Sequence, residues 1–278
     1  MDYHMDLNKI LSEYDEMFGR YSLQEIEGFL LKNLSEARFK FENEVLVALL
    51  NEAIGFYRDT TQKEKALKLC GELNELLISM NLQGSIAYAT SLLNIANAFR
   101  AFGVYKESLL LFEKVEDIYR KHLSKEDFMF ASLYNNWSLV YQEIGEFEKA
   151  VELLEKALKV VDSYQDAVIP QATTRTNLGS SLLCVGSETS YQKAVGYLKE
   201  ALNIFEKDGG SDFHYSAALV AMGDALSLKE DYQKSVKYNL SGLSEIDKHT
   251  GKIENYDRVY EKYEFARSNA DKLGWKSN

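Results

Sequence analysis

The chain of 278 residues is 46% hydrophobic and 12% aromatic, which is enough for a sizeable core and excludes a disordered protein. Its 32 basic and 43 acidic residues give a net charge of −11, which argues against nucleic acid or an anionic membrane surface as a partner. The chain has a single proline, and Leu, Ala, Glu and Lys recur at spacings of three and four, so the sequence predicts an all-α fold.

The first residues show no targeting pattern. MDYHMDLNKILSEYDEMF has acidic residues where a secretory signal has basic ones, and no later run is long and apolar enough to span a bilayer. Cys70 and Cys184 are the only cysteines, and each lies in a helical pattern. We therefore expect a cytoplasmic protein without disulfides, with both cysteines in the core.

Residues 1–40 are predicted to form an N-terminal helical cap or a divergent repeat. The segment from 6 to 40 reads as two helices broken near Gly19. Ser22 followed by Glu25 has the spacing of a capping box, which predicts that the second helix begins there.

Residues 41–250 contain five similar units. An offset of 42 residues aligns LYNNWSLVYQEIGEFEKAVELLEKAL with SLLNIANAFRAFGVYKESLLLFEKV and places Asn136 on Asn94 and Gly145 on Gly103. The units start near residues 46, 89, 131, 172 and 216, which makes the repeat 41 to 44 residues long. Small residues recur in both helices of a unit, with aromatic residues between them. This pattern predicts closely packed helix hairpins that bury their apolar faces by stacking on one another.

Two further features concern the helix boundaries in the second half. Pro170 is expected to precede a helix, a position that proline tolerates. Residues 251–278 read as one charged capping helix that ends near Gly274.

The repeating pattern resembles the tetratricopeptide repeat. One unit shows it as Ser138, Tyr141, Gly145, Phe147 and Ala150, and the resemblance covers about three quarters of the chain. The long units are similar to those of the kinesin light chain type. The resemblance implies a right-handed α-α superhelical solenoid, in which the first helix of each hairpin lines a concave groove.

The sequence offers little support for catalysis. The common phosphate-loop, dinucleotide, zinc-protease and serine-hydrolase motifs do not occur, so we expect no enzyme, cofactor or metal. The densest polar cluster holds Asp212, His214 and Tyr215, in a loop that more simply begins a helix.

Asparagine recurs at the sixth position of four successive units, as Asn51, Asn94, Asn136 and Asn177. A side-chain amide can pair with both the C=O and the N–H of one peptide unit, so a ladder of asparagines could hold an extended peptide by its backbone. Tetratricopeptide arrays of the kinesin light chain type and bacterial peptide receptors use groove asparagines in this way. The alternative is that these side chains bond to a neighbouring helix or to water.

The face expected to line the groove is polar and lightly charged. Asn135 lies beside Asn136, which makes the third unit the expected centre of the groove, and two arginines could anchor a carboxylate. The predicted site consists of Asn51, Arg58, Asn94, Asn97, Arg100, Asn135, Asn136, Asn177 and Asp224.

The function predicted from the sequence is a scaffold that binds a protein or peptide. The alternative is a receptor of the bacterial regulatory type that senses a short signalling peptide, although residues 1–40 leave little space for an output domain ahead of the repeats. An uncharacterised enzyme is a third possibility, and it rests on the loop with His214 alone.

Overall fold

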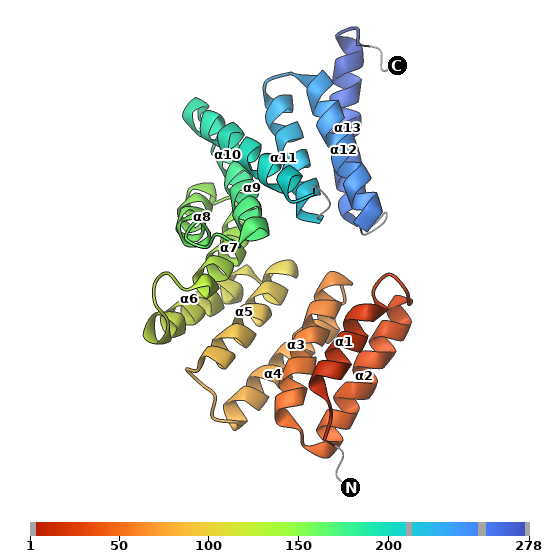
Figure 1. The fold of residues 1–278 in the computed structure, drawn as a ribbon, viewed down its shortest axis with the longest axis vertical. Helices are drawn as coiled ribbons and strands as arrows, with labels where there is room; N and C mark the ends of the chain where they lie inside the picture. Colours follow the sequence, from red (N-terminus) through yellow and green to blue (C-terminus); the bar gives the residue numbers. More distant parts are fainter. Residues whose placement is uncertain (1–3, 210–212, 250–253, 276–278) are drawn as a thin grey trace. The chain divides into compact units, whose positions relative to one another are not determined.

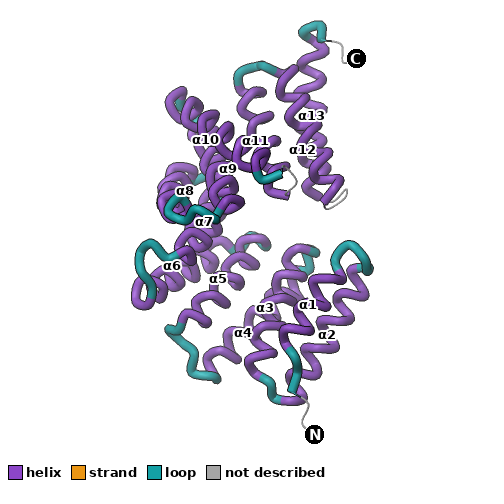
Figure 2. The backbone as a smooth tube through the Cα atoms, viewed as in Figure 1, coloured by secondary structure: helices purple, strands orange, loops and turns teal. Residues whose placement is uncertain are grey.

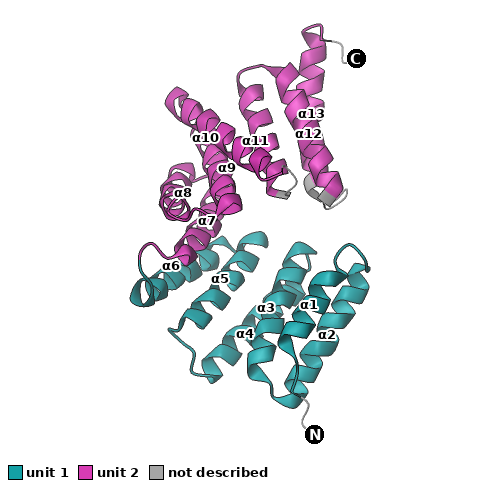
Figure 3. Ribbon diagram, in the orientation of Figure 1, with its two compact units in different colours: residues 1–124 teal, residues 125–278 magenta. Residues whose placement is uncertain are grey.

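A computed structural model describes residues 4–209, 213–249 and 254–275, and every regular element in these ranges is an α-helix (Figure 2). The chain divides into two compact units, residues 1–124 and residues 125–278 (Figure 3). The all-α fold predicted from the sequence is therefore confirmed. Among the described residues, no helix has the length and apolar character that a bilayer-spanning segment requires.

Unit 1 and unit 2 are each built from consecutive helices joined by short turns (Figure 1). The helices of unit 1 are α1 (Leu7–Met17), α2 (Leu23–Lys40), α3 (Asn43–Asp59), α4 (Lys63–Ser79), α5 (Ile86–Ala101) and α6 (Tyr105–His122). Those of unit 2 are α7 (Phe128–Glu143), α8 (Phe147–Val161), α9 (Val168–Val185), α10 (Glu188–Lys207), α11 (Phe213–Leu228), α12 (Tyr232–His249) and α13 (Glu254–Lys272).

Within each unit the helices form hairpins, and successive hairpins stack. The first helices of neighbouring hairpins lie side by side, so α3 contacts α5 in unit 1, and α9 contacts both α7 and α11 in unit 2. The second helix of a hairpin also packs against the first helix of the next, as α8 does against α9. This is the arrangement that the repeat pattern predicts.

Local sequence explains where the helices start. The Ser22 hydroxyl accepts a hydrogen bond from the backbone N–H of Glu25, and the Glu25 carboxylate accepts one from the backbone N–H of Ser22 at 2.9 Å. The predicted capping box is therefore confirmed, and it satisfies N–H groups that have no partner within the helix. Ser85 and Asp127 cap α5 and α7 with a single bond each, since their side chains accept from the backbone N–H of Tyr88 and of Met129.

The turn within a hairpin depends on a left-handed residue. Gly103 and Gly145 have φ values of 74° and 80°, and the Val104 N–H that follows the first of them donates to the Phe99 carbonyl at 2.8 Å. This bond and the glycine form a Schellman-type helix end, which explains why glycine recurs at this point of the repeat. Thr61 takes the same conformation at φ 58°, where a β-branched residue is strained.

Pro170 corrects one sequence-based expectation. It does not precede a helix but lies within the first turn of α9, which begins at Val168. The missing N–H costs nothing there, because the first N–H groups of a helix have no partner within it.

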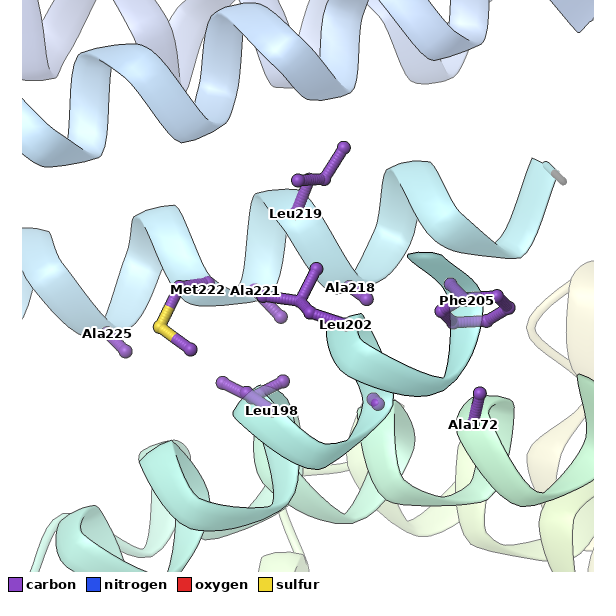
Figure 4. Close-up of a cluster of buried hydrophobic side chains, with 10 residues drawn as sticks. Ala172, Leu198, Leu202, Phe205, Ala218, Leu219, Ala221, Met222 and Ala225 are labelled. Atoms are coloured by element: carbon purple, nitrogen blue, oxygen red, sulfur yellow. The ribbon is translucent and has the colours of Figure 1, made fainter. Parts of the chain in front are cut away.

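The core of unit 2 lies where α9, α10 and α11 meet (Figure 4). Phe205, Leu198 and Met222 pack there against small residues such as Ala172. At Gly179 the approach is so close that a Cβ atom would lie 2.7 Å from the Leu198 Cγ. Only glycine therefore fits the contact between α9 and α10 without movement of a buried leucine.

In two of the hairpins, a buried serine of the second helix is hydrogen-bonded to the first helix. The Ser108 hydroxyl donates to the Ala96 carbonyl oxygen and the Ser235 hydroxyl donates to the Gly223 carbonyl oxygen, each at 2.8 Å. The small residues of the repeat thus allow close packing and, at these two positions, supply a buried hydrogen bond as well.

The last helix covers an apolar face of α12, as expected of a cap. Val259 on α13 is buried with Leu243 and Ile246 of α12 and with Val220 of α11. The helix ends at Lys272, and Gly274 follows with φ 84°, close to the predicted end.

Candidate functional site

In unit 1, an asparagine pair joins the first helices of two hairpins. The Asn51 side-chain amide on α3 donates to the Val47 carbonyl at 2.9 Å and to the Ser91 hydroxyl on α5 at 3.1 Å. The Asn94 amide on α5 donates back to the Asn51 backbone and side-chain oxygens, at 3.0 Å and 3.1 Å. These amide groups therefore hold α3 and α5 together.

In unit 2, the equivalent link is made by Asn135. Its side-chain amide donates to the Ala131 carbonyl at 3.0 Å and to the Thr174 hydroxyl on α9 at 2.9 Å. The Asn177 amide in turn donates to the Asn135 side-chain oxygen at 3.3 Å. Asn135 thus takes the role in α7 that Asn51 has in α3.

This arrangement differs from the sequence alignment, which grouped Asn136, not Asn135, with Asn51, Asn94 and Asn177. One residue along a helix is a rotation of about 100° about its axis. The hydrogen bonds show that α7 is turned so that Asn135 faces α9, and Asn136 is left to point elsewhere. An alignment gives the position along a helix but not this rotation.

Asn136 bonds only within its own helix. Its amide donates to the Ser132 carbonyl at 2.9 Å, and its side-chain oxygen accepts no hydrogen bond from the described residues. The side chain is half-buried. Of the three asparagines at this point of α7 and α9, Asn136 is therefore the one whose amide makes no bond to another helix, and its side-chain oxygen can accept a hydrogen bond from a ligand.

A cavity of about 430 Å³ opens beside these asparagines. Asn135, Asn136 and Asn177 all lie on its wall, and so does Thr173, whose hydroxyl is buried without a hydrogen-bond partner. The rest of the wall includes the apolar residues Phe128, Ala131, Leu139, Val161, Ile169 and Pro170. The third repeat, which the sequence favoured as the centre of the groove, thus borders a partly open cavity on α7 and α9 with polar and apolar walls.

The other predicted site residues do not join this cavity. Arg58 on α3 is bonded to the adjacent Asp59 at 2.8 Å, so its guanidinium is already neutralised. Asn97, which the sequence predicts to face a groove, is buried on α5, with 7% of the residue exposed. Arg100 is half-buried on α5, and Asp224 on α11 pairs with Lys262 of α13.

In unit 1 the residue after the bridging asparagine is an acid near another acid, whereas in unit 2 it is the amide of Asn136 beside the cavity. Glu52, the residue after Asn51, is half-buried on α3, and burial followed by the charge of Asp15 raises its pKa. Burial and then the Glu52 charge also raise the pKa of Tyr14, so this part of α1 lies close to α3. Glu52 therefore lies near Tyr14 and Asp15 of α1, within its own unit.

The loop considered for catalysis is only partly described. Asp212 lies outside the described residues, and His214 is exposed at the edge of the cavity. The Tyr215 hydroxyl donates to the Glu206 carboxylate at 3.4 Å, and burial and then that carboxylate raise the pKa of Tyr215. Among the described residues, no group of three or more His, Cys, Asp or Glu has a metal-binding arrangement.

Sequence reasoning missed the hydroxyl partners of the asparagines. Ser91 and Thr174 each lie three residues before the asparagine of their own helix and accept a bond from the asparagine of the preceding hairpin. The signal was present, because Ser91-Leu-Leu-Asn94 and Thr174-Arg-Thr-Asn177 share a Ser/Thr-x-x-Asn spacing. This spacing places hydroxyl and amide on one helix face.

Comparison with known proteins supports the repeat assignment. The sequence model of the family described as Tetratricopeptide repeat matches residues 89–128 and 130–161. A search of curated proteins found no match at the sequence level. These two segments therefore match the tetratricopeptide repeat, which the sequence predicted there.

Solved structures show the same fold over a larger part of the chain. A Podosopora anserina kinesin light chain with nearly identical tetratricopeptide-like repeats is 19% identical, with a TM-score of 0.57 over 72% of this chain and 93% of that one. BtubC from P. vanneervenii is 15% identical, with a TM-score of 0.59 over 99% and 95%. The quorum sensor NprR from B. thuringiensis is 14% identical, with a TM-score of 0.66 over 100% and 74%. At these identities the likeness concerns the fold, a tetratricopeptide-like helical solenoid.

Proposed function

We propose that this protein binds an extended peptide segment, which lies along α7 and α9 of unit 2 with its backbone against Asn136. The observation that carries the proposal is the cavity of about 430 Å³, whose wall combines Asn136, the partnerless Thr173 hydroxyl and an apolar surface. Such a mixture of a few convergent polar groups and an apolar wall is typical of a ligand site. Catalysis is not part of the proposal.

The asparagines have two roles in this proposal. Asn135 and Asn177 are bonded to each other, and Asn135 also to Thr174, so they hold α7 and α9 at the spacing that forms the cavity. Asn136 has an unused acceptor, and its donor is bonded only to its own helix. It can accept from a peptide N–H while its amide donates to a peptide carbonyl.

A free signalling peptide is the second candidate ligand. The cavity has the volume of a compact ligand site, and the chain shares its fold along its full length with the quorum sensor NprR. A segment of a larger protein and a free peptide would be held by the same backbone groups. Comparing one sequence as a free peptide and within a fusion protein separates the two.

The test begins with peptides selected from a displayed library of random 12-residue sequences against the full chain. Their affinities are then measured by fluorescence polarisation for the wild type and for Asn136→Ala. Because one or two hydrogen bonds to the ligand are lost, we expect affinity to fall by about fivefold to tenfold. The melting temperature should not fall, because alanine is the better helix former.

Asn269→Ala is the matched control. Asn269 on α13 also donates to the carbonyl four residues earlier, at 2.8 Å, but does not line the cavity. Its substitution should leave affinity unchanged. Selected peptides that bind Asn136→Ala as tightly as the wild type, or a selection that yields no binding peptide, would contradict the proposal.

A further inference from the structure

We propose that the peptide site of unit 2 has a second part, an apolar subsite between α9, α11 and α13 that takes one large apolar side chain of the bound segment. This inference rests on the proposed function and adds a sequence preference to it. The ligand class is a peptide with a leucine-like or phenylalanine-like residue at a fixed distance from the backbone held by Asn136.

The subsite is a cavity of about 750 Å³. Its wall includes Leu183 of α9, Leu228 of α11 and Phe265 of α13. Leu228 and Phe265 are 60% and 58% exposed, which is unusual for large apolar side chains that lie together in one hollow. Covering them with an apolar ligand side chain removes that surface from water.

Helix α9 connects this subsite with the asparagine cavity. Thr173 and Asn177 line the first cavity, and Ser180 and Cys184 line the second. The steps of three and four residues between them keep all four on one face of α9. A ligand that follows this face therefore passes from the first cavity into the second.

The distance along α9 fixes the spacing in the peptide. Asn177 and Cys184 are seven residues apart, which is about 10.5 Å along a helix axis. An extended peptide covers this length in about three residues, at about 3.3 Å each. We therefore expect the apolar anchor three residues from the peptide unit that the asparagine cavity holds.

The charges at the rim favour a neutral side chain. Asp224 and Lys262 form an ion pair across the subsite, and the remaining charged groups are one base, Arg258, and one acid, Glu261. The wall thus offers no net charge to a charged ligand group. Placing such a group in the hollow would cost desolvation without compensation.

Cys184 provides a reporter inside the subsite. It is the exposed cysteine of the chain and lies on the wall of this cavity. The sequence placed it in the core, but the last turn of α9 leaves its side chain open because the neighbouring helices do not cover it. Cys70 is buried, and burial raises its pKa to about 12, so a thiol reagent near pH 8 modifies Cys184 selectively.

The experiment uses the full chain and peptides selected from the random 12-residue library. Affinities are measured for the wild type, for Leu228→Lys and for Leu110→Lys. Leu110 on α6 of unit 1 is 56% exposed and serves as the matched control, since both substitutions introduce a lysine at an exposed leucine. The rate at which iodoacetamide modifies Cys184 is measured with and without saturating peptide.

We expect the selected peptides to share a large apolar residue. Leu228→Lys should lower affinity at least tenfold and Leu110→Lys should leave it unchanged, while saturating peptide should slow modification of Cys184 at least tenfold. If the peptides need Asn136 but bind Leu228→Lys normally and leave Cys184 reactive, the subsite is refuted and the proposed function stands. If Asn136→Ala has no effect, or no peptide is selected, both are refuted.

Discussion

Asn51-Glu52 in unit 1 and Asn135-Asn136 in unit 2 are equivalent pairs whose first residues make the same kind of hydrogen bond and whose second residues have different surroundings. The first asparagine of each pair donates to a hydroxyl of the next hairpin, Ser91 in one case and Thr174 in the other. The second residue is a half-buried carboxyl group near Asp15 in unit 1 and an amide beside a cavity in unit 2.

The two units therefore share one inter-helix bond but differ in the surroundings of the residue that follows it. The inter-helix bond is the same in both units, so it cannot be what distinguishes a ligand site. The two units differ at the next residue, Glu52 or Asn136, which lies about 100° further round the helix. Glu52 lies near α1, whereas Asn136 lies beside an open cavity. Burial of Glu52 and the ligand contact that we propose for Asn136 are thus two uses of one position.

The largest expected effect on stability concerns the packing that holds α9 in place. Gly179→Ala would put a Cβ atom 2.7 Å from Leu198, and we expect a loss of about 1 to 3 kcal/mol in the free energy of unfolding from overpacking. In unit 1 the aligned residue is Ala96, where Ala96→Gly should cost only about 1 kcal/mol. Urea unfolding measures both, and hydrogen exchange should locate the first effect in α9 and α10. An unchanged midpoint for Gly179→Ala would show that Leu198 can move freely.

The bridging asparagines come next. Asn135→Ala removes a donor that serves Thr174 and an acceptor that serves Asn177, so we expect a loss of about 1 to 2 kcal/mol, and a similar loss for Asn51→Ala. Asn136→Ala should be neutral or stabilise by about 0.5 kcal/mol, because among the described residues the Asn136 amide bonds only to the carbonyl and hydroxyl of Ser132 in its own helix. Urea unfolding of the three variants tests this order. Equal losses for Asn135→Ala and Asn136→Ala would remove the distinction between the two residues.

The sequence predicted the helices, the repeats and the capping box at Ser22, because all of these depend on local spacing. Periodicity places apolar and small residues on the packed face of each helix, and the glycines at Gly103 and Gly145 mark the turns. The rotation of α7 that turns Asn135, and not Asn136, toward α9 was not predictable, since it depends on how α7 packs against other helices. The exposure of Cys184 and the cavity under Leu228 depend on tertiary packing in the same way.

A smaller effect on stability, which depends on pH, is expected at Glu52. Its raised pKa means that the folded state holds the proton more tightly than the unfolded chain, so Glu52 lowers stability as the pH rises above its ordinary value of 4.5. Glu52→Gln should therefore unfold at a higher urea concentration than the wild type at pH 7, and the difference should vanish below pH 4.5. Glu75→Gln, at an exposed glutamate of α4, is the control and should leave the urea midpoint at pH 7 nearly unchanged. A destabilised Glu52→Gln at pH 7 would mean that the carboxylate has a favourable partner in unit 1.

The smallest expected effect is on the reactivity of the two thiols, Cys184 in unit 2 and Cys70 in unit 1. Burial and then the charge of Asp224 raise the pKa of Cys184, whereas Lys262 lowers it. Because the thiolate is the reactive form, Asp224→Asn should lower that pKa and speed modification by iodoacetamide at pH 8 by a few-fold, and Lys262→Gln should slow it. Peptide-level mass spectrometry follows Cys184 and Cys70 separately, and buried Cys70 should stay unmodified in every variant. Faster modification of Cys184 in both variants would show instead that breaking the ion pair opens the subsite, because loss of either partner then has the same result.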